Sequence, residues 1–219
     1  MIPVLCQHPH FVVINKPEGV HFHSQDGQPG LVVQLEAQLG QKLYPVHRLD
    51  TPTSGVLLLA RSSEAAAELS QAFAEHSMEK RYLALSDSKP KKKQGWVKGH
   101  IVKARRGAWK LARQGEGGQA STQFVSTGLG EGMRLYLLRP LSGKTHQIRV
   151  TLKSLGAPIL GDRLYGGSDA DRTYLHALSL TFEFRTEQHH FVGLPERGEH
   201  YLSPQVQDAV RQWLAHPPL

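Results

Sequence analysis

The sequence predicts an α+β fold, a mixed and largely antiparallel sheet flanked by helices, with a central cleft. Short apolar runs separated by turn-forming residues mark the strands, and several of these runs alternate with a period of two, as in a sheet with one face open to solvent or to a cleft. Helical patterns fall between the strands irregularly. This order favours α+β over the regular strand–helix alternation of a doubly wound sheet.

The strands are expected where an apolar run is bounded by Gly, Pro, Asp or Ser. The run VLLLA is short, begins with the β-branched Val56 and follows Gly55, so it predicts a buried strand. In chain order the predicted strands are Phe11–Asn15, Val56–Ala60, Arg81–Leu85, Thr122–Val125, Arg134–Arg139 and Leu178–Phe184.

Four helices are expected from apolar spacing and end signals. Gly156 followed by Pro158 ends the third, and Ser203 followed by Pro204 begins the last with an N-cap and a proline at the first helical position. The last helix carries one apolar stripe, which contains Val206, Val210 and Trp213. The first three helices are predicted at Leu31–Leu39, Ser63–Glu75 and Thr145–Leu155.

Length and composition predict one domain over residues 1–219, because this length suits a single core with a pronounced cleft. The sequence holds no apolar run near the ~18 residues of a membrane span, and the N-terminus lacks the pattern of an export signal. We therefore expect a monomeric cytoplasmic protein. The single cysteine, Cys6, excludes an intramolecular disulfide and argues against a Cys-rich zinc site.

The net charge of +7 is concentrated in a basic segment, residues 89–113, which has ten Lys or Arg and no Asp or Glu. The rest of the chain has 16 basic and 19 acidic residues. Trp96 and Trp109 lie within it, a composition that suits a polyanion whose phosphates are neutralised and whose bases can stack. A solvated loop is the alternative. The side chains expected to contact RNA are Lys91, Lys92, Lys93, Lys98, Arg105 and Arg106.

The stretch HRLDTPTSG, residues 47–55, places Asp50 at the rim of the predicted core, just before the buried strand. A carboxylate there is partly desolvated and needs hydrogen bonds or a cation to stay ionised. Its simplest explanation is a turn residue that accepts hydrogen bonds from the loop backbone. The alternative is a functional carboxylate with a cationic partner elsewhere in the chain.

Three more stretches put polar groups at the ends of apolar elements: NKPEG (15–19), KRYLAL (80–85) and GKTHQIRV (143–150). Together with HRLDTPTSG they resemble the RluA-type pseudouridine synthases. The order of GQAST (118–122), GAPILGDRLYG (156–166) and LHA (175–177) agrees with that family. The resemblance covers nearly the whole chain, although the region after LTFEF lacks the His-Pro often found there.

The resemblance implies the pseudouridine synthase fold, with a central active-site cleft and no S4-like domain. It implies an isomerase that flips a specific uridine of rRNA or tRNA out of its stack and converts it to pseudouridine without a cofactor. Asp50, Tyr82 and Arg149 would be catalytic, and Arg48 would fill the space left by the flipped nucleotide. The other substrate-binding residues would be Lys16, His47, Thr53, Lys80, His146, Gln147 and Ile148.

The resemblance implies that Arg149 pairs with Asp50 across the cleft. On a helix that starts near Thr145, His146 and Arg149 would share a face, so both could point at the same cleft. Without the resemblance, Tyr82 would be assigned to the core. For Arg48, an ordinary surface arginine is the alternative. A non-catalytic RNA-binding or ribosome-assembly factor is the second hypothesis. A metal-dependent hydrolase is the third and is not favoured, because the thirteen histidines, including the pairs His8/His10 and His189/His190, lack a recognised ligand spacing.

Overall fold

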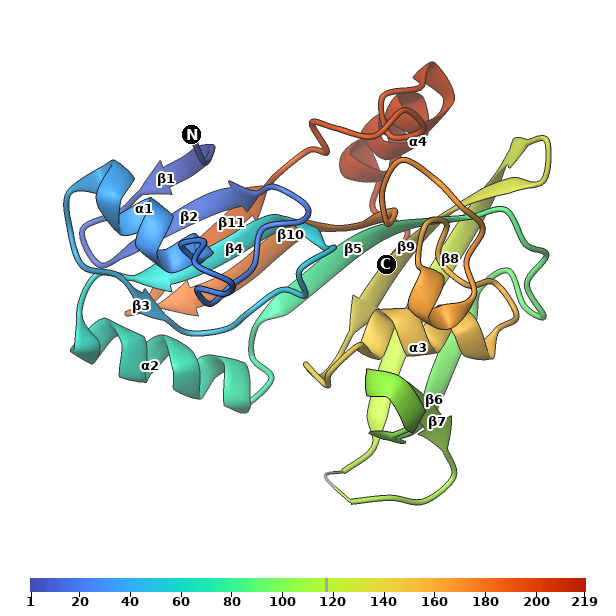
Figure 1. The fold of residues 1–219 in the computed structure, drawn as a ribbon, viewed down its shortest axis with the longest axis horizontal. Coiled ribbons are helices and arrows are strands. Elements are labelled where there is room, and N and C mark those ends of the chain that lie inside the picture. The colour runs from blue at the N-terminus through green and yellow to red at the C-terminus, as the bar shows by residue number, and fades with distance from the viewer. Residues whose placement is uncertain (117) are drawn as a thin grey trace. The chain divides into compact units, whose positions relative to one another are not determined.

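The runs FVVINK and SGVLLLA form two fully buried antiparallel strands, β2 (Phe11–Lys16) and β4 (Ser54–Ala60), in the computed structural model of the protein. The structure describes residues 1–116 and 118–219, which divide into two compact units (Figure 1). The first unit comprises Met1–Lys80 and His176–Leu194, and the second comprises Arg81–Leu175 and Pro195–Leu219.

The first unit is built on a mixed sheet with the strand order β1-β2-β4-β10. Strand β4 pairs antiparallel with β2 and parallel with β10, while β11 extends β10 as an antiparallel hairpin and the short β3 pairs with β4. The remaining elements of this unit are β1 (Val4–Gln7), α1 (Leu31–Leu39), β3 (Tyr44–Pro45), α2 (Ser63–Ala74), β10 (Leu175–Phe184) and β11 (Glu187–Val192).

Branched and aromatic side chains from β2, β4, α2 and β10 fill the core of this unit. Phe11, Leu58 and Phe182 are members of one buried cluster, and Leu69 joins it from α2. Helix α2 begins where the sequence predicts, because the Oγ of Ser62 accepts a hydrogen bond from the N–H of Ala65 at 3.1 Å and so caps the helix.

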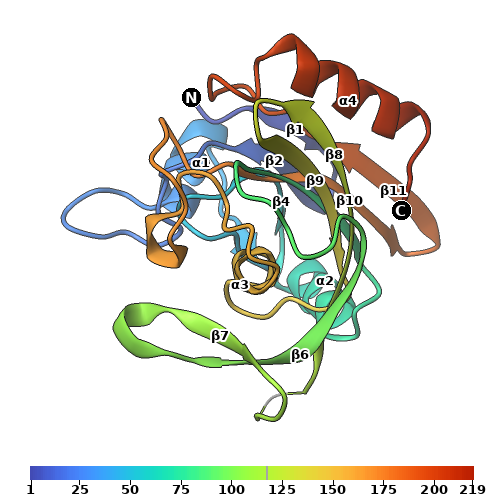
Figure 2. The same ribbon diagram turned by 90° about the vertical axis from the view of Figure 1, so that its right-hand side faces the viewer.

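The second unit is an antiparallel sheet with the strand order β5-β9-β8-β6-β7. Helix α3 packs against β6, β7, β8 and β9, and α4 packs against β8; Figure 2 shows the β6–β7 hairpin beside α3. Two 3-10 turns cover Arg105–Gly107 and Arg163–Tyr165. The elements are β5 (Glu79–Ser86), β6 (Gly95–Lys103), β7 (Trp109–Ala112), β8 (Ala120–Gly130), β9 (Met133–Pro140), α3 (Gln147–Ser154) and α4 (Pro204–Ala215).

The predicted mixed sheet with helices is confirmed, and all six predicted strands and four predicted helices are present. The third helix starts at Gln147, so the predicted start at Thr145 is wrong. Most of the basic segment forms the β6–β7 hairpin, and β1, β3 and β11 are further strands that the sequence did not predict. Among the described residues, no helix has both the length and the apolar character that crossing a membrane requires.

Candidate active site

Asp50 lies in a tight turn directly before β4. Its backbone carbonyl accepts a hydrogen bond from the N–H of Thr53 at 2.9 Å, which closes the turn over residues 50–53. Asp50 itself is half-buried, whereas Thr53 is buried at 2% exposure. The predicted position of Asp50 at the rim of the core is therefore confirmed, and its side chain is left partly exposed.

Lys16, the last residue of β2, fixes this turn through hydrogen bonds to its backbone. The side chain is only 1% exposed, and its Nζ donates hydrogen bonds to the carbonyls of Pro17 at 3.0 Å, Thr51 at 3.2 Å and Thr53 at 2.8 Å. An ammonium has three N–H donors, so three backbone acceptors fix its direction. Lys16 thus positions the Asp50 turn, and its expected contact with substrate stays a prediction.

The end of the motif, Ser54-Gly55, fixes the turn to β10. Gly55 has a φ of 116°, and a Cβ at this position would lie 2.2 Å from the carbonyl oxygen of Ala177, so only glycine allows the two strands to approach. The Oγ of Ser54 lies 2.8 Å from Nδ1 of the buried His176, whose Nε2 lies 2.6 Å from the carbonyl of Gly193. A carbonyl only accepts, so Nε2 carries the proton and Ser54 donates to Nδ1.

His47 is a structural part of the same motif. Its Nε2 accepts a hydrogen bond from the N–H of Leu58 at 3.0 Å, next to the short pairing of β3 with β4, and its ring stacks on Phe73 at 4.2 Å. Burial, with a smaller contribution from Lys80, lowers the pKa of His47 to about 3, so the ring is neutral near pH 7. Burial also lowers the pKa of Lys80 to about 8. Arg48, by contrast, is exposed.

In the second unit, Arg149 on α3 forms a two-point ion pair with Asp162. Arg149 Nε lies 2.7 Å from Oδ2 and Nη2 lies 2.9 Å from Oδ1, and the side chains are 6% and 2% exposed. The guanidinium also lies over the ring of Tyr165, 5.0 Å from its centre. Asp162 was not predicted as a site residue. The expected pairing of Arg149 with Asp50, which belongs to the other unit, stays a prediction.

Tyr165 is a second residue in contact with Arg149 that the sequence analysis did not single out. Its hydroxyl lies 2.7 Å from Nδ1 of His146 and accepts a hydrogen bond from the backbone N–H of Trp109 at 2.9 Å. His146 has a φ of 54° and precedes the helix, so the prediction that His146 and Arg149 share a helix face is wrong. Tyr165 brings the two together instead, through its hydroxyl and its ring.

Gln147 and Ile148, the first residues of α3, are buried at 4% and 5% exposure. Oε1 of Gln147 accepts hydrogen bonds from the Ser142 hydroxyl at 2.8 Å and the Lys144 N–H at 3.0 Å, while Nε2 donates to the Thr122 hydroxyl at 3.0 Å. Gln147 therefore ties the loop before α3 to β8. Contacts of these two residues with substrate stay predictions.

Tyr82 lies on β5, where it pairs with Leu138 of β9 and is half-buried. The next residue, Leu83, is fully buried, so β5 enters the core directly after Tyr82. A half-buried ring has a surface left for stacking, which a core tyrosine lacks. Its catalytic role stays a prediction.

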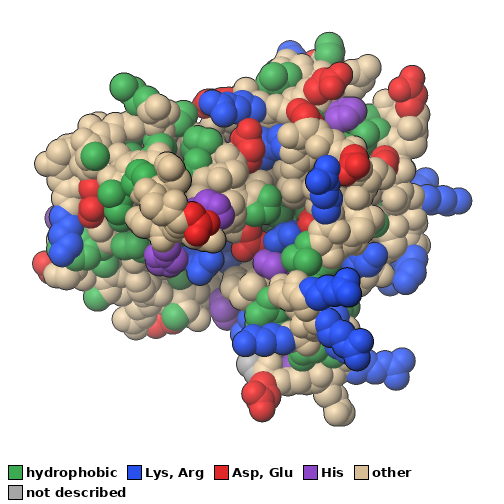
Figure 3. All heavy atoms as spheres, in the orientation of Figure 1, with side chains coloured by type: hydrophobic (Ala, Val, Ile, Leu, Met, Phe, Trp, Pro, Cys, Tyr) green, Lys and Arg blue, Asp and Glu red, His purple; other side chains and the backbone are tan. Residues whose placement is uncertain are grey.

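The β6–β7 hairpin carries most of the basic segment, and all ten of its Lys and Arg residues are exposed. Figure 3 shows Lys and Arg side chains gathered over this hairpin. The two tryptophans differ: Trp96 is 39% exposed, and Lys98 Nζ lies 5.4 Å from its ring centre, whereas Trp109 packs against the buried cluster that contains Tyr165 and Val150 of α3. Trp96 is therefore the more open of the two for stacking with a base.

A family model described as RNA pseudouridylate synthase matches residues 10–154. This range holds the Asp50 turn, Tyr82, the basic hairpin and Arg149. The chain belongs to the RluA-type RNA pseudouridine synthase family. A pseudouridine synthase is an isomerase that converts uridine in RNA to pseudouridine. Asp162 and Tyr165 lie beyond the matched range. In this synthase, their contacts with Arg149 are what single them out.

Relatives of this pseudouridine synthase agree over most of their length. A Haemophilus influenzae protein described as an uncharacterized RNA pseudouridine synthase is 46% identical over 99% of this chain and 97% of its own. The tRNA pseudouridine synthase C of Vibrio parahaemolyticus is 34% identical over 83% of this chain and 84% of its own. The solved structure of human RNA pseudouridylate synthase domain containing 4 has a TM-score of 0.73 and 28% identity, covering 94% of this chain and 93% of that one.

Proposed function

We propose that Asp50 is the catalytic residue that this synthase uses to isomerise a specific uridine in rRNA or tRNA. The observation that carries the proposal is the fixed turn: buried Lys16 holds the carbonyls of Thr51 and Thr53, and the turn leaves Asp50 half-buried at the rim of the core. A carboxylate held in one place without full burial can act on a substrate without first reorganising.

The reaction breaks the bond between N1 and C1′ of the uridine, turns the base and joins C1′ to C5. Asp50 acts in its ionised form, either as a nucleophile toward the sugar or the base, or as the base that removes a sugar proton. We propose that Arg149 pairs with Asp50, while its two hydrogen bonds to Asp162 fix the orientation of the guanidinium. Tyr82 is proposed to stack on the uracil with its hydroxyl near the C5 proton.

The two units are proposed to act together as one catalytic domain, since the family match runs from residue 10 in the first unit to residue 154 in the second. RNA is proposed to contact the exposed basic side chains of the β6–β7 hairpin, with Arg48 filling the space left by the flipped uridine. We propose a monomer that works in the cytoplasm, where rRNA and tRNA are found.

The substrate class rests on the relatives. Proteins from Vibrio and Salmonella that are named tRNA pseudouridine synthase C share 32% to 36% identity with this chain, which supports tRNA as one candidate substrate. Mapping pseudouridines in the rRNA and tRNA of cells with and without the gene tests the proposal. We expect one or a few positions to disappear and to return with the wild-type gene but not with Asp50→Asn. Return of the modification with Asp50→Asn would favour the non-catalytic RNA-binding factor.

A further inference from the structure

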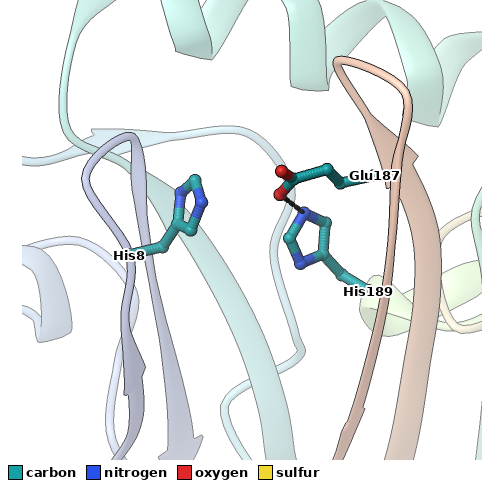
Figure 4. Close-up of side chains that lie close together, drawn as sticks. All are labelled: His8, Glu187 and His189. Atoms are coloured by element: carbon teal, nitrogen blue, oxygen red, sulfur yellow. Dashed lines mark ion pairs between the residues drawn. The ribbon is translucent and has the colours of Figure 1, made fainter.

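The fold brings together three side chains that are far apart in the sequence: His8 in the turn between β1 and β2, and Glu187 and His189 on β11 (Figure 4). One possible ligand atom from each residue lies within 4.8 Å of those of the other two. His189 Nε2 is 3.9 Å from Oε2 of Glu187. The sequence suggested only neighbouring histidine pairs, and the contact between the two hairpins joins His8 to His189 instead.

The half-buried side chain of His189 has one nitrogen that makes no hydrogen bond. Within residues 1–116 and 118–219, its Nε2 is inaccessible to solvent and has no hydrogen-bond partner. Buried polar atoms of this kind are rare and call for a partner such as an ion. Aromatic rings hold the imidazole in place, with the ring centres of Phe11 at 5.1 Å and Phe182 at 5.4 Å.

His8 is held as firmly as His189. Its ring stacks on Phe11 at 4.1 Å, and its Nδ1 accepts a hydrogen bond from the N–H of His10 at 3.2 Å. Nε2 is then the nitrogen that His8 can offer to a ligand. The Nη1 of Arg61 donates to the backbone carbonyl of His8 at 2.8 Å and fixes the turn. The imidazole centres of His8 and His189 are 5.4 Å apart.

We propose that His8, Glu187 and His189 bind a divalent transition-metal cation, with zinc as the representative ion. Two imidazoles and one carboxylate favour zinc, nickel or copper over magnesium or calcium, which prefer oxygen ligands alone. Zinc ligand atoms lie about 2.0–2.2 Å from the metal, hence about 3.4 Å from one another in a tetrahedron. The separations here are all within 4.8 Å, so they require a closure of at most about 1.4 Å, to which rotation of the exposed Glu187 side chain contributes.

The position of this metal site sets its role. Phe11 pairs with Ala60 at one end of the β2–β4 ladder, beside the three ligands, and Lys16 pairs with Gly55 at the other end, beside the Asp50 turn. Five residue steps of strand separate the two ends by about 17 Å. The cation would therefore join the β1–β2 turn to β11 and stabilise the first unit, and it would take no part in the isomerisation.

The chain offers a matched control for this site. His190 is the neighbour of His189 on β11, but successive side chains on a strand point to opposite faces, and its Nδ1 lies 2.6 Å from the hydroxyl of Thr181. His190→Gln removes one histidine without touching the cluster. Glu187→Gln changes an exposed side chain and so tests the site without disturbing the core.

Metal-free full-length protein is titrated with zinc chloride by calorimetry, and its Tm is measured with and without zinc. We expect one zinc ion with a Kd of about 10 µM or tighter and a Tm raised by zinc. His189→Gln and Glu187→Gln should each weaken binding at least about tenfold, while His190→Gln binds as the wild type does. Absence of binding at 100 µM zinc, wild-type affinity in Glu187→Gln, or equal losses in His189→Gln and His190→Gln would each overturn the proposal.

Discussion

Arg149 and Asp162 meet through two parallel hydrogen bonds, Nε to Oδ2 at 2.7 Å and Nη2 to Oδ1 at 2.9 Å, and both side chains are almost completely buried. Two-point pairing of a guanidinium with a carboxylate fixes the plane of the guanidinium as well as its position. Asp162 therefore sets the orientation of Arg149, the proposed partner of the catalytic aspartate, and removing Asp162 should affect both folding and turnover.

Asp162→Asn should lower the free energy of unfolding by about 3–5 kcal/mol, because the buried guanidinium of Arg149 loses the carboxylate that it meets through two hydrogen bonds. Asp169→Asn is the matched control. Asp169 also pairs with an arginine, Arg163 at 2.9 Å, but both side chains are 81% exposed, so its loss should cost less than about 1 kcal/mol. Chemical denaturation of the two variants measures the difference. Equal losses of unfolding free energy in the two variants would show that the buried Arg149–Asp162 pair stabilises the fold no more than the exposed Arg163–Asp169 pair.

Tyr165→Phe should loosen the attachment of the basic hairpin to α3. The phenyl ring still supports Arg149, but the N–H of Trp109 and Nδ1 of His146 lose their partner, at a cost of about 1–3 kcal/mol. Hydrogen exchange at the Trp109 amide should become faster. Tyr201→Phe, which removes a hydroxyl bound to the carbonyl of Leu83, should leave exchange at Trp109 unchanged. Unchanged exchange in Tyr165→Phe would disprove the link.

The sequence predicted the strands whose apolar residues run continuously or alternate with polar ones, and it missed strands such as β6 and β11 that have neither pattern. β2 and β4 are buried along their whole length, so their composition alone marks them. β6 carries Lys98 and Lys103 on a half-exposed hairpin, and β11 (EQHHFV) lies at an edge, so neither has an apolar run to detect. Such strands form because they pair with a neighbouring strand, and their own sequences do not reveal this pairing.

Within the candidate site, the sequence singled out Asp50, Tyr82 and Arg149. The motif GAPILGDRLYG (156–166) contains Asp162 and Tyr165, but nothing in it assigned them a role. These two contact Arg149 from 13 and 16 residues away, through a loop whose path depends on tertiary structure. Gly161 shows why: a Cβ there would lie 1.8 Å from the carbonyl of Arg172, so the loop is pressed against another segment. The start of α3 was misplaced because His146 adopts a positive φ, which is uncommon for a residue other than glycine.

His47 should make the protein sensitive to acid. Its pKa is about 3 in the folded protein and 6.5 in the unfolded chain, so between these values the unfolded chain binds the extra proton. The stability that the neutral ring contributes is complete above pH 6.5 and falls as pH drops toward 3, by about 1.4 kcal/mol per pH unit. Unfolding at pH 7 and pH 5 should give a steeper loss for the wild type than for His47→Gln. Parallel losses in both would contradict the assignment.

The basic hairpin should supply RNA affinity without supplying chemistry. Replacing Lys98, Lys103 and Lys110, exposed residues of the hairpin, with Gln should weaken RNA binding and flatten its salt dependence, by about 0.7 in log–log slope for each phosphate of single-stranded RNA that the variant no longer neutralises. The control replaces three exposed basic residues outside the hairpin, Lys42, Arg197 and Arg211, with the same change in net charge. Equal effects of the two triple variants would mean that net charge, and not the hairpin, attracts the RNA.

The central claim is that Asp50 carries the chemistry, and release of tritium from RNA labelled at C5 of uridine tests it most directly, because C5 loses its hydrogen when it bonds to C1′. Wild-type protein and Asp208→Asn, an exposed aspartate on α4, should release tritium at equal rates. Asp50→Asn should release none while it stays folded and binds the RNA with equal or slightly greater affinity. Release by Asp50→Asn at the wild-type rate would contradict the account.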